Sequence, residues 1–241
     1  VVAGWNKPEY DAFGVDLPSD HIDRYAMAQE WFDYTQKLWT EDNAFDWNGD
    51  FYRGKGVYSL PHPIQPKMPI INAAGSEEGR VFALRNADFL FTPVFDFDQA
   101  KATVVDITER AASVKRKVDV LTFCTVVCRP NQQEADDYLH WYADEHADLE
   151  AVDNLMTLQG MHAQSFTPEA LALYRDRMAA GHGGFPLVGT PDTIADLLEK
   201  LSETGIAGTT LAFVDYAKEF PYFAQEVLPR LEAKGLRKPF N

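Results

Sequence analysis

The chain has 241 residues, of which 46% are hydrophobic and 13% aromatic, so it can build a substantial core and is not expected to be disordered. Its formal net charge of −15 argues against a nucleic-acid or anionic-membrane partner, because both need a clustered positive surface. The sequence shows no signal peptide, no apolar run of transmembrane length and no lipidation motif, and it therefore predicts a cytoplasmic protein.

The first ten residues predict the carboxyl end of a buried strand that leads into a functional loop. Val1 and Val2 are β-branched, and an Ala-Gly pair follows them. Parallel α/β proteins place their chemistry at this end of a strand. Glu9 in the loop can accept a hydrogen bond from a ligand, although an isolated loop glutamate is more often simply solvated.

A helix and a hairpin are predicted next. Ser19 or Asp20 can cap a helix that runs to about Thr40. The pair Asn48-Gly49 between two aromatic-rich runs predicts a two-residue hairpin turn. Dense prolines then predict a loop over 60–66.

Strands and helices alternate along the rest of the chain. Apolar runs predict strands over 69–74, 89–94, 118–128 and 209–215. Helical spacing and capping residues predict helices over 77–86, 97–115, 132–149, 152–165, 168–180, 190–205 and 218–234. This alternation implies right-handed βαβ crossovers and a parallel sheet, which is the α/β class.

The predicted strands are too few for a closed barrel. They number four, plus the stub at Val1, whereas a (β/α)₈ barrel needs eight strands and about 250 residues. Either about a hundred further residues precede Val1, or another chain supplies the missing half. Unpaired sheet edges also predict association into a homo-oligomer. An open flavodoxin-like sheet is the alternative, but it lacks the usual glycine-rich first turn.

The two cysteines predict free buried thiols. Cys124 and Cys128 lie in one predicted strand, where four residues span about 13 Å, and the Cα atoms of a disulfide lie within about 7 Å. Free thiols fit a reducing compartment. No His or Cys pair at ligand spacing accompanies them, so no metal is expected.

The segment Ala74-Gly75-Ser76 is a candidate phosphate site between a predicted strand and a predicted helix. Backbone N–H groups, the helix dipole and the Ser76 hydroxyl would meet there. Small residues at such a turn are also often only an N-cap. Glu77 and Glu78 would repel a phosphate if they pointed inward, so we expect them to face solvent.

Arg24 and Tyr25, in the first turn of the first long helix, are candidates for binding a phosphate or a flavin edge. We expect Arg24 to meet Gly75 and Ser76 at one anion site. The alternative is a surface ion pair beside a core tyrosine.

Together these segments resemble the luciferase-like flavin monooxygenases, a family of (β/α)₈ barrels. The segments follow the order of that family: Gly4-Trp5 with Pro8-Glu9, Arg24-Tyr25 with Glu30, Leu38-Trp39, Asn48-Gly49, Ala74-Gly75-Ser76 and Ala87-Asp88. The chain looks like the C-terminal two-thirds of a member from the branch of pyrimidine, dimethyl-sulfone and alkanesulfonate monooxygenases. The resemblance implies one partial barrel domain over 1–241 that lacks strands one to three and most of strand four. It also implies a helical insertion and lid at about 130–186.

The resemblance implies roles for individual residues. Glu9 matches a glutamate at the flavin site of the pyrimidine-oxidising members, the Arg24-Tyr25 pair matches their Arg-Tyr pair, and Ser76 matches their phosphate-binding serine. Ala74 and Gly75 complete the implied cofactor-binding set. The family commonly has Gly-Ser-Ser here, so one hydroxyl contact to phosphate is lost.

Further candidates come from the second half of the chain. The stretch 181–189 aligns with the family's mobile loop, and three glycines around His182 would let it close and exclude water. A flexible connector is the plain alternative. Asp215 ends the last predicted strand and can orient a substrate or cap the next helix. Thr125 stands where sulfonate-oxidising members have a histidine, which argues against an alkanesulfonate substrate. Glu9, His182 and Asp215 are thus the candidate catalytic residues.

The function implied by the resemblance is that of a two-component monooxygenase. Reduced FMN from a separate flavin reductase would react with O₂ and oxygenate a small organic substrate containing nitrogen or sulfur. A non-catalytic flavin-binding or partner subunit is one alternative, and a deazaflavin-dependent oxidoreductase is another.

Overall fold

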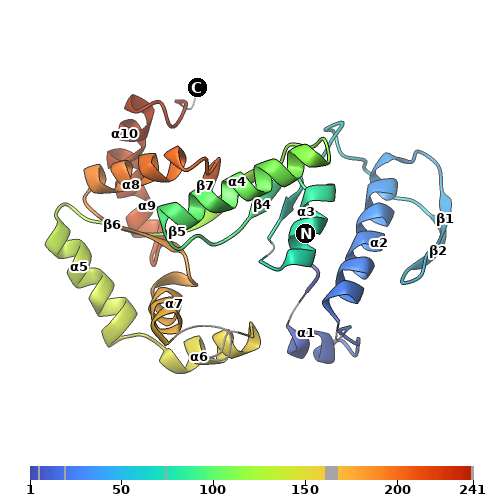
Figure 1. Cartoon of the computed structure of the whole chain (residues 1–241), viewed down its shortest axis with the longest axis horizontal. Coiled ribbons are helices and arrows are strands. Elements are labelled where there is room, and N and C mark those ends of the chain that lie inside the picture. Colours follow the sequence, from blue (N-terminus) through green and yellow to red (C-terminus); the bar gives the residue numbers. More distant parts are fainter. Residues whose placement is uncertain (5, 19, 74, 161–167, 240–241) are drawn as a thin grey trace. The chain divides into compact units, whose positions relative to one another are not determined.

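The computed structural model describes residues 1–4, 6–18, 20–73, 75–160 and 168–239 and has an α/β fold (Figure 1). The chain folds as two compact units, unit 1 (Val1–Leu90 and Val114–Val118) and unit 2 (Phe91–Ser113 and Asp119–Asn241). Among the described residues, no helix is both long and apolar enough to cross a membrane.

The elements of unit 1 are α1 (Lys7–Ala12), α2 (His21–Thr40), β1 (Phe45–Asn48), β2 (Arg53–Val57), β3 (Ile71–Asn72), α3 (Glu77–Asn86) and the first residues of β4 (Phe89–Phe91). Those of unit 2 are α4 (Phe97–Ser113), β5 (Asp119–Cys128), α5 (Gln132–His140), the π-helical turn η1 (Trp141–Glu145), α6 (Leu149–Leu158), α7 (Pro168–Gly181), β6 (Phe185–Gly189), α8 (Pro191–Glu203), β7 (Gly208–Ala212), α9 (Tyr216–Glu226) and α10 (Leu228–Ala233).

Helix α2 begins where the sequence predicts, because Asp20 caps it. The Asp20 carboxylate accepts a hydrogen bond from the N–H of Ile22 (2.7 Å). The buried ring of Phe32 lies edge-on to Phe82 of α3, with 5.9 Å between the ring centroids. Aromatic contacts of this kind join the two helices that carry the candidate cofactor residues.

The hairpin turn between β1 and β2 is longer than predicted. Asn48 pairs with Arg53, so residues 49–52 form the connection. The carboxylate of Glu30 on α2 accepts hydrogen bonds from the N–H groups of all three residues 50–52, at 2.8–2.9 Å. These bonds hold residues 50–52 out of the strand ladder, and the predicted two-residue turn is therefore wrong.

The N-terminal segment lies beside β3. The amino group of Val1 donates to the carbonyl of Ile71 (2.6 Å), and the Val1 carbonyl accepts from the side-chain amide of Asn72 (2.8 Å). The segment thus runs alongside β3, but it is not a regular strand and Val2 is exposed. Residues 7–12 form helix α1 in place of the predicted loop.

Three predicted strands differ clearly from the structure: β7 ends at Ala212 rather than at the predicted Asp215, and β3 and β4 are also shorter than predicted. Strands β3 and β4 pair in parallel, with Ile71 opposite Phe89, and cover only parts of the predicted ranges 69–74 and 89–94. The Ile70 carbonyl next to β3 accepts hydrogen bonds from the N–H groups of Asp88 and Phe89 (2.8 and 3.1 Å). Beyond β4, residues 92–96 form no regular element before α4 begins at Phe97.

Strand β5 is the central strand of unit 2. Its residues 124–125 pair with residues 185–186 of β6 and also with residues 211–212 of β7, all in parallel. Because a strand has only two edges, β6 and β7 flank β5 on opposite sides. Strand β6 lies in a stretch that the sequence assigns to a loop, so the predicted strand count was one too few.

The structure confirms the α/β class with parallel strands. Among the described residues, the strands β3 to β7 form parallel pairs and do not close into an eight-stranded barrel. The prediction of an incomplete barrel therefore agrees with the structure of this chain.

Helix boundaries also differ in unit 2. The predicted helix 132–149 is interrupted by the π-helical turn η1, and the predicted helix 218–234 begins at Tyr216 and breaks at Val227. Pro229 lies in the first turn of α10, where a missing N–H is tolerated.

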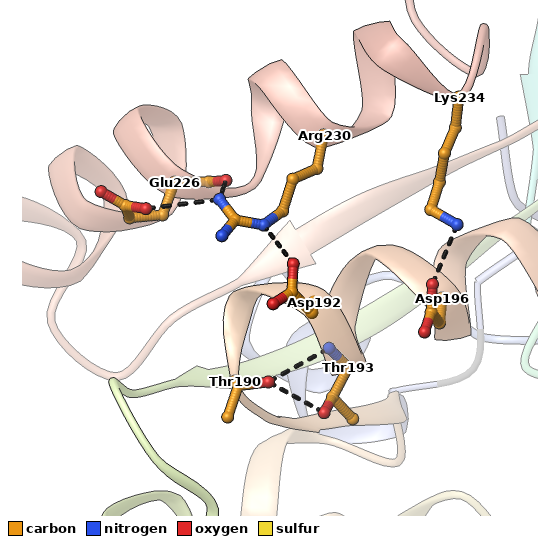
Figure 2. A network of polar contacts seen from close by, with 7 residues as sticks. All are labelled: Thr190, Asp192, Thr193, Asp196, Glu226, Arg230 and Lys234. Carbon is orange, nitrogen blue, oxygen red and sulfur yellow. Dashed lines mark hydrogen bonds and ion pairs between the residues drawn. The ribbon is translucent and has the colours of Figure 1, made fainter.

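Ion pairs fasten α10 to α8, as Figure 2 shows. The Arg230 Nε donates to Asp192 (2.6 Å), and the Lys234 ammonium lies 2.9 Å from Asp196. The Thr190 hydroxyl accepts from the N–H of Thr193 (3.2 Å) and caps α8. The helix predicted from the Thr-Pro pair therefore begins where expected.

Candidate functional site

Tyr25 lies on α2 and Ser76 precedes α3 in unit 1, and the Ser76 hydroxyl lies within hydrogen-bonding reach of the Tyr25 phenol. Ser76 is the N-cap of α3, and its oxygen accepts from the N–H of Gly79 (3.2 Å), so the capping alternative is confirmed for this serine. Burial raises the pKa of Tyr25, and the hydrogen bond with Ser76 opposes that shift. The phenol is therefore neutral at pH 7 and can donate a hydrogen bond.

The turn before α3 leaves room for a ligand. Apart from Gly75 itself and its two chain neighbours, no heavy atom of the described residues lies within 4 Å of the point where a Cβ on Gly75 would stand. Ala74 lies outside the described residues. The N–H groups at the start of α3, the helix dipole and the nearby hydroxyls all favour an anion at this place.

Glu78 differs from the expectation that both glutamates face solvent. Glu77 is exposed, but Glu78 is half-buried. Burial and the Ser76 hydroxyl have the two largest effects on the pKa of Tyr25. The charge of Glu78 has the next largest effect and raises this pKa. A carboxylate therefore lies within electrostatic range of the hydroxyl pair.

Arg24 is half-buried and lines a cavity of about 270 Å³ in unit 1. The residues that line this cavity are Val1, Val2, Ala3, Tyr10, Arg24, Met27, Ala28, Trp31 and Tyr52. The charge of Arg24, the chain neighbour of Tyr25, also lowers the pKa of Tyr25, and it is the smallest of the four influences on that pKa. Glu9 is exposed on α1, where its carboxylate accepts from the Asn6 side-chain amide (2.9 Å).

Glu30 orders the residues around this cavity. Besides the three N–H groups of the turn, its carboxylate accepts a hydrogen bond from the Trp47 indole (3.1 Å). Burial would raise the pKa of Glu30, but the hydrogen bonds from Phe51, Trp47, Tyr52 and Asp50 outweigh it and lower the pKa. Since Tyr52 lines the cavity, Glu30 positions one of its walls. The sequence placed Glu30 in the family order but did not indicate this role.

In unit 2, His182 lies at the end of α7. It is exposed, its backbone is in the left-handed region (φ 56°), and its N–H donates to the carbonyl of Met178 (3.0 Å). The N–H of Gly183 donates to the carbonyl of Arg177 (3.0 Å). These are the bonds of a helix C-cap, and they support the connector alternative for this stretch.

The glycines beside His182 allow a close approach to β5. The hydroxyl of Thr125, which is buried, donates to the carbonyl of Gly181 (3.3 Å). A Cβ on Gly184 would lie 2.6 Å from the Thr125 hydroxyl oxygen. Packing against β5 therefore accounts for a glycine at position 184.

Asp215 caps α9 and lines a cavity of unit 2 that is larger than the cavity of unit 1. Its carboxylate accepts from the N–H of Lys218 (3.2 Å) and lies 2.8 Å from the Lys218 ammonium, which lowers the pKa of Asp215. The cavity has a volume of about 780 Å³ and follows the carboxyl ends of β5 and β7. Its lining residues are Cys128, Arg129, Pro130, Tyr138, Trp141, Val214, Asp215, Tyr216, Lys218, Glu219 and Tyr222.

Arg129 and Glu219 form a largely buried ion pair in this cavity wall. The Arg129 Nη2 donates to Glu219 (2.8 Å), and the guanidinium lies 3.9 Å from the ring centroid of Tyr138. The second Glu219 oxygen accepts from the N–H of Val214 (3.2 Å). Ninety positions separate the paired residues, and no sequence signal links them.

Both cysteines are free and buried in β5, as predicted. The Thr209 hydroxyl donates to the Sγ of Cys124 (3.1 Å). Burial raises the pKa of Cys124 and of Cys128 to about 11, so both are neutral thiols at pH 7.

The chain is similar to known flavin enzymes. A family model described as luciferase-like monooxygenase matches residues 1–208. The FMNH₂-dependent dimethylsulfone monooxygenase of Pseudomonas fluorescens (strain Pf0-1) is 31% identical over 98% of this chain and 66% of its own length. The pyrimidine monooxygenase RutA of Bradyrhizobium sp. (strain BTAi1 / ATCC BAA-1182) is 27% identical over 98% of this chain and 67% of its own length. The crystal structure of DmoA from Hyphomicrobium sulfonivorans matches with a TM-score of 0.79 at 22% identity, over 95% of this chain and 59% of that chain, which shows the fold. The chain thus spans just under two thirds of the dimethylsulfone monooxygenase.

Proposed function

The chain belongs to the luciferase-like monooxygenase family, and on this premise we propose that it carries the cofactor and substrate sites of a two-component monooxygenase. The cofactor is reduced FMN, which a separate flavin reductase supplies, and the co-substrate is O₂. The organic substrate is small and contains nitrogen or sulfur, as the names of the dimethylsulfone and pyrimidine monooxygenases suggest.

The observation that carries the proposal is the placement of Tyr25 and Ser76 around an open turn. Two hydroxyl groups, the first N–H groups of α3 and the clear space at Gly75 together fit a flavin phosphate. Arg24, the chain neighbour of Tyr25, adds a positive charge. We propose that these residues, with Ala74, bind FMN.

The residues of the chain bind and orient, while the flavin supplies the oxygen chemistry when it is bound. Tyr25 is neutral, so its hydroxyl would donate a hydrogen bond to the phosphate, and Glu30 holds Tyr52 against the cavity of unit 1. In unit 2 the four aromatic side chains of the larger cavity would shield an organic ligand from water.

Catalytic roles for Glu9, His182 and Asp215 remain predictions. Glu9 accepts a side-chain hydrogen bond from Asn6 and Asp215 caps a helix, contacts that account for their residue types, whereas His182 forms its helix C-cap through the backbone alone. The variants Glu9→Gln, His182→Asn and Asp215→Asn each remove the acid or base function and keep a side chain of similar size. A selective loss of turnover with unchanged flavin binding would assign that residue to catalysis.

The function is tested by anaerobic titration of the chain with reduced FMN, reduced riboflavin and a reduced deazaflavin. FMN is expected to bind most tightly, and Ser76→Ala should weaken FMN binding by ~1 kcal/mol or more, about five-fold. Tight FMN binding without substrate oxidation in the presence of a flavin reductase would favour the partner-subunit alternative. A preference for the deazaflavin would favour the deazaflavin-dependent oxidoreductase.

A further inference from the structure

The larger cavity of unit 2 has aromatic walls. Four of its lining residues are aromatic: Tyr138, Trp141, Tyr216 and Tyr222. Trp141, Val214 and Tyr216 are exposed (48%, 48% and 57%), although burial of large apolar side chains is favourable. A volume of about 780 Å³ lies in the range that accommodates ring-containing ligands.

The charges in the cavity wall are paired with one another. Arg129 lies 2.8 Å from Glu219, and Lys218 lies 2.8 Å from Asp215. An anionic or cationic ligand would therefore have to compete with an existing partner and lose its own hydration. This arrangement favours a neutral ligand.

The aromatic groups form a stack with one open end. The Arg129 guanidinium lies 3.9 Å from the centroid of Tyr138, and the Tyr138 ring stacks with Trp141 (5.8 Å between centroids, 26° between planes). His146 meets Trp141 edge-on (5.0 Å, 73°). The indole nevertheless remains about half exposed and offers area on which a further ring can stack.

The backbone at Trp141 is also unusual. Trp141 is the first residue of the π-helical turn η1, and such turns are frequent at functional sites. The Tyr142 hydroxyl donates to the carbonyl of Ala180 at the end of α7 (3.0 Å), which fixes this turn in place. The turn therefore holds the indole at the cavity without help from a ligand.

We infer that this cavity binds a neutral aromatic or heteroaromatic ring, which extends the Arg129–Tyr138–Trp141 stack. That the ring belongs to the oxygenated substrate rests on the proposed function. The inference narrows the class of substrate from any small nitrogen- or sulfur-containing compound to a compound that carries a ring.

Calorimetric titration of the flavin-free chain with 2-naphthol, a neutral two-ring probe, tests this inference. We expect saturable binding, at least ten-fold weaker binding of cyclohexanol and dimethylsulfone, and weaker binding of the 1-naphthoate anion. Trp141→Leu should weaken 2-naphthol binding at least five-fold, whereas Trp141→Phe keeps a ring and should retain most of it. Tyr58→Ala is the matched control, because Tyr58 is an exposed aromatic residue of unit 1 (69%).

The inference is overturned if 2-naphthol does not bind, if cyclohexanol binds equally well, or if Trp141→Leu, with a native circular dichroism spectrum, binds like the wild type. These outcomes are separate from those of the proposed function, because no flavin is present. Ring binding without oxygenation would contradict the function alone, and oxygenation of a substrate without ring binding would contradict this inference alone.

Discussion

The hydroxyl of Ser76 at the start of α3 lies within hydrogen-bonding reach of the Tyr25 phenol on α2 and lowers its pKa, against the larger effect of burial. Ser76 also accepts the N–H of Gly79, so one oxygen both caps the helix and takes part in the candidate phosphate site. The two interpretations of this serine, as a cap and as a ligand contact, are therefore compatible. Any variant of Ser76 changes both roles, and Tyr25 offers the cleaner test.

Tyr25→Phe should weaken FMN binding and leave riboflavin binding unchanged. The substitution removes the hydroxyl but keeps the ring that packs 5.9 Å from Phe82, and a lost hydrogen bond to a phosphate corresponds to ~1.5 kcal/mol, about ten-fold in affinity. Titration with both flavins measures it. Tyr34→Phe on the same helix is the control, and an equal loss for riboflavin would contradict a role at the phosphate.

Glu78→Gln should tighten FMN binding several-fold. Its carboxylate lies within electrostatic range of the Tyr25–Ser76 pair and repels a phosphate dianion, so the neutral amide removes this repulsion. Riboflavin, which has no phosphate, should bind both proteins alike. The exposed neighbour gives the matched control Glu77→Gln, which should have the smaller effect. Weaker FMN binding by Glu78→Gln would show that the carboxylate supports the site.

The Glu30 carboxyl should make stability depend on pH below neutrality. Its pKa in the folded chain lies below the usual value, so its contribution is present above the unfolded pKa of about 4.3 and is lost as the pH falls through the folded pKa. Denaturant unfolding followed by tryptophan fluorescence between pH 3 and pH 6 measures the slope. Glu30→Gln should flatten it. An unchanged slope in Glu30→Gln would contradict the four-bond arrangement.

The sequence predicted those elements whose ends are set by local chemistry. Helix α3 was predicted with its observed bounds because Ser76 caps it, and α2 begins where Asp20 can cap it. The Asn48-Gly49 turn was predicted wrongly because Glu30, on another element, takes up the N–H groups of the turn. Turn and capping patterns in the sequence do not predict contacts between elements that are distant along the chain.

Other features were missed for the same reason. Strand β6 contains Pro186 and follows several glycines, which indicates a loop, but its residues 185, 187 and 189 are buried beside β5. A proline is tolerated because β6 pairs with only one strand, β5, in the described sheet. The Arg129–Glu219 pair and the π-helical turn at Trp141 depend on tertiary packing and leave no pattern in the sequence.

The two cysteines should be unreactive toward a thiol reagent in the folded chain at pH 8 and should both react after unfolding. Their folded pKa values are about 11, above the unfolded value of about 8.5. Above about pH 8.5 the thiols of the unfolded chain lose their protons, while the folded chain keeps them until the pH reaches the folded pKa. The free energy of unfolding should therefore fall between about pH 9 and pH 11. Cys128→Ala should reduce this slope. Rapid labelling of the folded chain would contradict the burial of these thiols.

Gly184→Ala should destabilise the chain by about 1–3 kcal/mol, because the new methyl group would meet the Thr125 hydroxyl at 2.6 Å and its backbone nitrogen at 3.1 Å. Thermal unfolding measures the effect. Gly75→Ala is the control, since its Cβ would meet no described atom within 4 Å beyond its own chain neighbours. Equal stability of Gly184→Ala and the wild type would show that 184 does not need a glycine.

The most direct measurement is the incorporation of oxygen from ¹⁸O₂ by this chain, with FMN and a flavin reductase, into dimethylsulfone, a pyrimidine and indole. If the chain forms the sites of a reduced-FMN monooxygenase, one labelled oxygen atom should enter the product for each substrate molecule consumed. Tyr25→Phe should slow the reaction at low FMN concentration, and omission of FMN should abolish it. Consumption of a substrate without label in its product, or labelled product without FMN, would contradict the proposed function.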